Sequence, residues 1–187
     1  MELNTAVPYF TTRDLAAVAV CAALWGVLNA LISPIFWQLT RMPFLCDLLA
    51  FISLTLVAWW TRKFGAITLT GLVVAVMTLI LRPGSFHILG FIAASLLFDV
   101  ATKGIGYRNC LDRMATGTVC IILLSTLSAG LAGIIIGSFF MDLTTLPAIL
   151  MFAGLHAIGG LIGGAIGFTV VRALAARKIQ PTIHIQP

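Results

Sequence analysis

Few side chains in this sequence are suited to chemistry, and the most informative of them point to ligand binding. They supply one acid, several hydrogen-bond donors and acceptors, and an aromatic ring, a mixture that orients a small organic ligand. Asp47 suits an amino or cationic group, whereas Arg41 or Arg82 suits a carboxylate or phosphate. The candidate substrate-binding residues are Asn29, Trp37, Gln38, Arg41, Asp47, Arg82, His87 and His156.

Motifs of catalytic and metal chemistry are absent from the sequence. There is no G-x-x-x-x-G-K-[ST], no H-E-x-x-H and no G-x-S-x-G. The four cysteines, at positions 21, 46, 110 and 120, form no C-x-x-C pair and no metal-ligand spacing. We therefore expect free buried thiols, no metal, no cofactor and no enzyme activity.

Several candidates also have a structural interpretation. Trp37 is typical of the aromatic belt at a membrane interface. Arg41 and Arg82 can extend their charged ends to the outer headgroups. His87 stands at an expected helix start, where a role in a loop or cap is the alternative to ligand contact.

Asp47, His156 and Asp99 lie inside expected membrane helices, and each has two interpretations. An acid there is costly and indicates function by default, so Asp47 is a binding candidate, with pairing to Arg41 across the helix end as the alternative. His156 lies in a glycine-rich segment, where it either packs or forms a pocket wall. Asp99 precedes Lys103 by four residues, a spacing that favours an ion pair over a proton relay.

The composition places this chain in lipid. Of its 187 residues 60% are hydrophobic and 9% are charged, with a mean hydropathy of +1.11. A soluble enzyme or nucleic-acid-binding protein is excluded by these values. Hydrophobic runs separated by turn residues predict an all-α integral membrane protein with six transmembrane helices in one domain over 1–187. The expected helices are about 14–33, 43–61, 64–81, 85–103, 112–138 and 147–177.

Basic residues predict the orientation of these helices. With the amino terminus inside, the inner side collects Arg13, Arg62, Lys63, Lys103, Arg108, Arg113, Arg172, Arg177 and Lys178, and Arg41 and Arg82 remain outside. Because inner loops retain Lys and Arg, both termini are expected to be cytoplasmic in a multi-pass protein of the cell (inner) membrane. The substrate-binding candidates then fall in the outer half, where one outward-facing pocket would bring them together.

Small residues predict where helices approach closely. The first expected helix contains Ala19-x-x-x-Ala23 and Ala22-x-x-x-Gly26, so Ala19, Ala23 and Gly26 are candidates for docking a partner membrane protein. The last helix reads GLHAIGGLIGGAIG, which favours tight packing against the helix at 112–138 within the chain.

Two parts of the sequence resemble the S components of energy-coupling factor (ECF) transporters. They are the start, TTRDLAAVAVCAAL, and the stretch from LLAFISLTLVAWWTRKFGAITL to the Pro-Gly turn and beyond. The likeness covers residues 11–178 and is greatest to hydroxymethylpyrimidine/thiamine-type S components. It implies ATP-driven uptake of a vitamin or vitamin precursor through a transmembrane coupling protein and two ATPase subunits.

The same resemblance implies roles for particular residues. Ala19 and Ala23 match the helix that docks the coupling protein. The family pocket is built from the last three helices and capped by the loop after the first, here 34–42, so that Trp37, Gln38, His87 and His156 would contact ligand. No His lies near the amino terminus, so nickel or cobalt is not expected. The alternative, a stand-alone small-solute channel or secondary carrier, requires the polar group to continue through the span.

Overall fold

The computed structural model describes residues 8–179, and the regular elements within that range are all helical. This confirms the all-α prediction; the ends of the predicted 1–187 domain, 1–7 and 180–187, lie outside the described residues. The elements are α1 (Thr12–Leu31), α2 (Ser33–Thr40), α3 (Phe44–Thr61), α4 (Ala66–Leu81), the 3₁₀ turn η1 (Phe86–Ile88), α5 (Leu89–Ile105), α6 (Tyr107–Leu111), α7 (Met114–Phe139) and α8 (Leu146–Ala176).

Five helices are long and apolar enough to cross a membrane, as expected of a multi-pass membrane protein. They are α1, α3, α5 together with η1, α7 and α8. Helix α4 forms at its expected place, but its 16 residues extend about 24 Å, less than a typical hydrocarbon core of about 30 Å. The sixth span therefore stays a prediction, as does the orientation of the termini.

The segment after the first long helix is itself helical, which corrects the loop expected at 34–42. Pro34 occupies the first turn of α2, where its fixed φ and missing N–H suit a helix start. The helix ends at Arg41, whose φ of 57° is left-handed and whose N–H donates to the carbonyl of Trp37. Pro34 thus begins a second helix instead of only ending the first.

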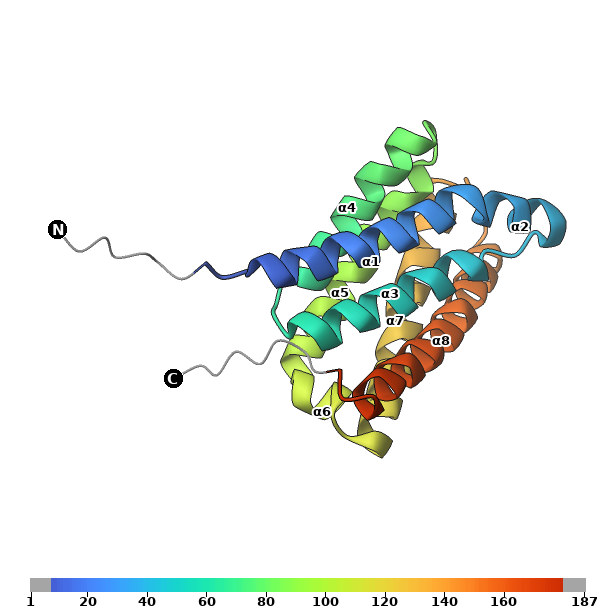
Figure 1. The fold of residues 1–187 in the computed structure, drawn as a ribbon. Helices are drawn as coiled ribbons and strands as arrows, with labels where there is room; N and C mark the ends of the chain where they lie inside the picture. The colour runs from blue at the N-terminus through green and yellow to red at the C-terminus, as the bar shows by residue number, and fades with distance from the viewer. Residues whose placement is uncertain (1–7, 180–187) are drawn as a thin grey trace.

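The charged residues separate toward the two ends of the bundle. The start of α1, α6 and the end of α8 share one end, here named the α6 end, and α2 lies at the other, the α2 end (Figure 1). Ion pairs between Lys63 and Asp14 and between Arg62 and Asp112 join segments at the α6 end. The expected segregation of basic residues to one end is therefore present in the fold.

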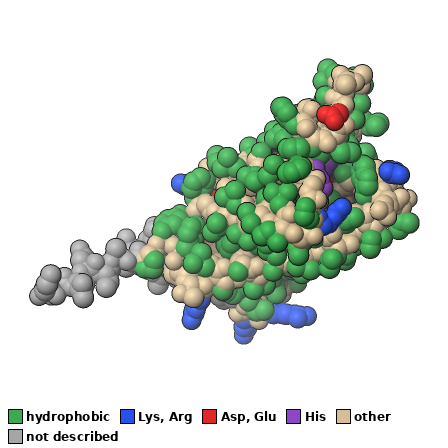
Figure 2. Space-filling model, turned by 90° about the horizontal axis from the view of Figure 1, so that it is seen from above, with side chains coloured by type: hydrophobic (Ala, Val, Ile, Leu, Met, Phe, Trp, Pro, Cys, Tyr) green, Lys and Arg blue, Asp and Glu red, His purple; other side chains and the backbone are tan. Residues whose placement is uncertain are grey.

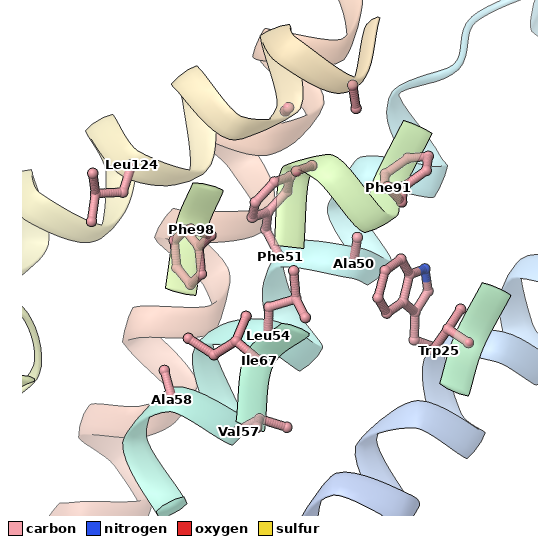
Figure 3. Close-up of a cluster of buried hydrophobic side chains, with 14 of the residues drawn as sticks. Trp25, Ala50, Phe51, Leu54, Val57, Ala58, Ile67, Phe91, Phe98 and Leu124 are labelled. Atoms are coloured by element: carbon pink, nitrogen blue, oxygen red, sulfur yellow. The ribbon is translucent and has the colours of Figure 1, made fainter. Parts of the chain in front are cut away.

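An apolar layer fills the middle of the bundle. Phe51 of α3 meets Phe98 of α5 edge-on with ring centroids 5.6 Å apart, and Trp25 of α1 meets Phe91 of α5 at 5.8 Å. Figure 3 shows these rings together with Leu54, and all five side chains are buried. Burial of such large side chains excludes water from the centre of the bundle.

Glycines on two faces of α8 allow close helix packing. A Cβ at Gly163 would lie 2.9 Å from Leu48 of α3, and one at Gly160 would collide with Ser125 of α7. Since real Cβ atoms essentially never approach so closely, both positions require glycine. The predicted packing of α8 against α7 is confirmed, and α3 is a second neighbour on the other glycine face.

Helix α1 presents different small residues inward and outward, which corrects one interface prediction. Gly26 is buried, and a Cβ there would meet the Met77 side chain of α4 at 3.5 Å. Gly26 therefore packs inside the bundle and is unavailable for a partner. Ala19 and Ala23 lie on the exposed face of the same helix.

The cysteines correct a second expectation. Cys110 of α6 and Cys120 of α7 form a disulfide, with their Cα atoms 5.3 Å apart. The turn between these helices folds the chain back, so residues ten apart in sequence meet in space. Cys21 and Cys46 are free, as expected.

Candidate functional site

A cavity of about 210 Å³ opens at the α2 end. Figure 2 shows histidine surface inside a hollow of a mainly hydrophobic face, with a basic side chain beside it. The cavity is large enough for one small organic molecule. Of the eight substrate-binding candidates, those that line it are Asn29, Trp37, Gln38, Arg82, His87 and His156.

Helix α2 positions one side of the cavity. It contributes Trp37 and Gln38 to the lining, and its first residue, Ser33, donates a hydrogen bond of 3.0 Å to the Asn29 side chain of α1. Both partners of this bond are buried. The bond joins α1 to the start of α2, the helix that contributes Trp37 and Gln38 to the lining.

Arg82 and His87 come from a separate segment, where the chain passes from α4 to η1. Arg82 ends α4 and is exposed, whereas His87 is half-buried in the 3₁₀ turn. The two side chains and His156 are near enough for their charges to interact. A positively charged side chain and two imidazoles therefore surround the cavity.

A buried pair forms the floor of the site. Nδ1 of His156 lies 2.8 Å from a carboxylate oxygen of Asp47, and both side chains are at least 98% buried. Two glycines allow this approach: a Cβ at Gly159 would lie 2.8 Å from Cβ of Asp47, and one at Gly133 would lie 2.9 Å from Cβ of His156. The glycines of α7 and α8 therefore position the pair.

The imidazole of His156 is held between aromatic rings. Its centroid lies 4.8 Å from that of Phe152 and 6.1 Å from that of Phe91. Nε2 has no hydrogen-bond partner within the described part of the chain. Because Nδ1 faces Asp47, Nε2 is the nitrogen left for a ligand in the cavity.

Two of the predicted ligand contacts lie outside the cavity wall. Asp47 sits behind His156 and is fully buried, so the imidazole separates its carboxylate from the site. Arg41 is exposed at the left-handed end of α2. The alternative pairing of Asp47 with Arg41 is also wrong, because the acid is paired with His156.

The cavity contains residues that the sequence reasoning missed. Phe91, Phe152 and Cys46 line it, and all three lie on membrane helices beside residues that were singled out. Phe91 follows His87 by four residues and Phe152 precedes His156 by four, a spacing that places side chains on one helix face. That periodicity was the available signal for the aromatic wall.

Another buried acid, Asp99, has a structural role, but with a partner other than the one expected. One of its oxygens accepts hydrogen bonds from N–H of Gly65 at 2.9 Å and from N–H and O–H of Thr68 at 3.0 and 2.8 Å. Asp99 thereby caps the start of α4. Lys103, its predicted partner, lies instead over the ring of Phe64, 4.4 Å from the centroid.

Direct metal binding has no support among residues 8–179, where no three His, Cys, Asp or Glu side chains converge. The site combines a flat apolar wall with a few directed donors, an arrangement that binds and orients a small molecule. Comparisons of the chain with protein-family models, curated proteins and solved structures find no match.

Proposed function

We propose that the protein is a substrate-binding membrane subunit that captures a small organic micronutrient at an outward-facing pocket in the cell (inner) membrane. The ligand is then delivered to an ECF-type coupling protein and, through it, to two ATPase subunits that drive uptake. The chain itself has no catalytic role in this scheme. A thiamine- or hydroxymethylpyrimidine-like vitamin is the ligand that the sequence resemblance implies.

The observation that carries the proposal is the cavity at the α2 end. It gathers six polar or aromatic candidates from four separate segments of the chain around a space of about 210 Å³. A buried histidine with an unpartnered nitrogen lies among them. Polar groups are costly in the interior of a membrane bundle, so a ligand that satisfies them accounts for their presence.

The middle of the bundle favours a binding subunit over a channel or carrier. Going from Asp47 toward the α6 end, the next buried side chains of α3 include Phe51 and Leu54, and α5 contributes Phe98. The buried polar side chains at this depth are hydroxyls, such as Ser53, Thr55 and Ser95, so charged groups of the described residues do not continue from the cavity through this layer. A solute leaves such a pocket by the way it entered or after a large movement of the whole subunit.

The outer face of α1 is the proposed contact with the coupling protein. Ala19 and Ala23 are exposed one turn apart, and small side chains let another helix approach closely in lipid. Toppling of the subunit beside its partner, as the ECF resemblance implies, would use this face.

Uptake measurements test the proposal. Changing Ala19 and Ala23 together to Leu should abolish ATP-driven uptake in cells that express the full transporter, because the helices can no longer approach. Small molecules retained by the purified variant, measured by mass spectrometry, should be unchanged. Ala173→Leu, at an alanine of α8 that is also exposed, is the control.

Two outcomes contradict the proposal. Uptake that continues at the normal rate in the double variant removes the docking role of α1. A correctly folded wild-type protein that retains and binds no small molecule removes the receptor function itself.

A further inference from the structure

The fixed charges around the cavity have one sign. Among the lining residues that the structure describes, Arg82 is the only Lys, Arg, Asp or Glu. No acidic side chain of the described chain forms an ion pair with it. The cavity therefore offers one lasting positive charge to a ligand, which favours a ligand of opposite charge.

The acid beside the cavity, Asp47, already has a partner. The carboxylate of Asp47 contacts Nδ1 of His156 at 2.8 Å and is fully buried behind the imidazole ring. A cationic ligand would have to displace His156 to reach it. The geometry thus removes the one feature of the sequence that favoured an amino or cationic ligand.

The state of this buried pair decides what His156 offers to a ligand. A net charge in the apolar interior is costly, so the pair is stable in its electrically neutral forms. In one form a carboxylate faces an imidazolium; in the other a carboxylic acid donates to Nδ1. Both forms leave the proton on Nε2, which makes this nitrogen a hydrogen-bond donor toward the cavity.

The apolar part of the site suits a flat ring. Phe91 and Phe152 flank His156, and Trp37 lies at the mouth on α2. Aromatic side chains bind planar rings by stacking and edge contacts in addition to burying their area. The volume of about 210 Å³ leaves room for one ring system with a short substituent.

From these contacts we infer that the ligand is a small aromatic or heteroaromatic acid with one negative charge, whose carboxylate meets Arg82 and whose ring or acceptor atom meets His156. The inference rests on the proposed function, since it assumes that this cavity is the receptor site. It replaces a cationic thiamine-like ligand by an anionic one. An amine in the same place would lie beside Arg82 without a counter-charge.

A competition among matched compounds tests the inference. The purified full-length protein is incubated with triplets that share a ring and differ in charge, such as benzoate, benzamide and benzylamine, and the bound compounds are identified by mass spectrometry. The acids should be enriched at least tenfold over their amides and amines. Arg82→Gln should lower the enrichment of the acids at least tenfold and leave that of the amides unchanged.

Arg41→Gln is the matched control, because Arg41 is a second arginine of the α2 end that lies outside the cavity. It should leave the preference for acids intact. Enrichment of amines or amides over acids overturns the anionic ligand while keeping a receptor. No enrichment of any compound, by a folded protein that still retains a small molecule from the cell, overturns the inference and leaves the receptor function standing. An equal loss in the two arginine variants assigns the preference to overall charge and also contradicts the inference.

Discussion

The two ends of the bundle differ in how their polar side chains are partnered. At the α6 end, Asp14 pairs with Lys63, Asp112 binds Arg62 through two hydrogen bonds, and Asp99 accepts three hydrogen bonds at the start of α4. At the α2 end, the buried imidazole of His156 keeps Nε2 without a partner in the described chain, and this residue lines the cavity. Unpartnered buried atoms of the described residues near the α6 end, such as Oδ1 of Asp99 and the Tyr107 hydroxyl, do not line that cavity.

This difference distinguishes a structural use of charge from a functional one. Acids that accept several hydrogen bonds from their own chain stabilise helix ends and connections, and a ligand would add nothing to them. A buried group that is left unpaired beside a cavity raises the energy of the empty state. The second arrangement is the one expected where a small molecule completes the site.

The largest expected effect comes from breaking the pair at the floor of the site. His156→Leu leaves Asp47 buried without its partner and should lower the free energy of unfolding by about 3–5 kcal/mol. Thermal unfolding in detergent checks the loss of stability, and binding of an aromatic acid should disappear with it.

The double variant Asp47→Leu, His156→Leu separates stability from binding. It removes both charges, so much of the lost stability should return, while acid binding stays absent. Binding that survives in the folded double variant would show that the pair has no contact with the ligand.

A smaller effect is expected at the other end. Asp99→Asn removes the negative charge that three donors share and should cost about 1–2 kcal/mol of unfolding free energy. Ligand binding should be unchanged, because Asp99 caps α4 on the far side of the apolar layer. Calorimetry and binding measured on the same preparation check both statements.

Arg62→Gln provides the matched comparison at the α6 end. Its ion pair with Asp112 is 30–40% exposed, so its removal should cost at most about 1 kcal/mol. Loss of ligand binding in Asp99→Asn, with normal binding in Asp47→Asn, would reverse the assignment of the two ends.

The long helices were predictable because each is a run of apolar residues bounded by turn residues. The expected ranges agree with the observed helices to within a few residues, since hydropathy and helix stops are local properties. Helix α2 was missed for a local reason as well. Pro34 ends one run and also suits the first turn of the next helix, and the pattern alone does not choose between these roles.

The site was predictable only as a set of residues. Placing the polar residues at the outer ends of the expected helices identified six residues that line the cavity. The pairing of Asp47 with His156, however, joins positions more than a hundred residues apart. It depends on glycine contacts between α3, α7 and α8 that no local pattern encodes. For the same reason Gly26 and Ala23, three residues apart, face opposite surroundings.

The central claim is that the α2 end holds a ligand site open to the exterior. It is tested most directly by single cysteines at Gln38, which lines the cavity, and at Asn109, which is exposed at the α6 end, after Cys21, Cys46, Cys110 and Cys120 are all replaced by Ser. In intact cells a membrane-impermeant maleimide should label position 38 alone, and the best-binding aromatic acid should slow that labelling. Labelling of position 109 from outside, or labelling of position 38 that the acid does not slow, would contradict the account.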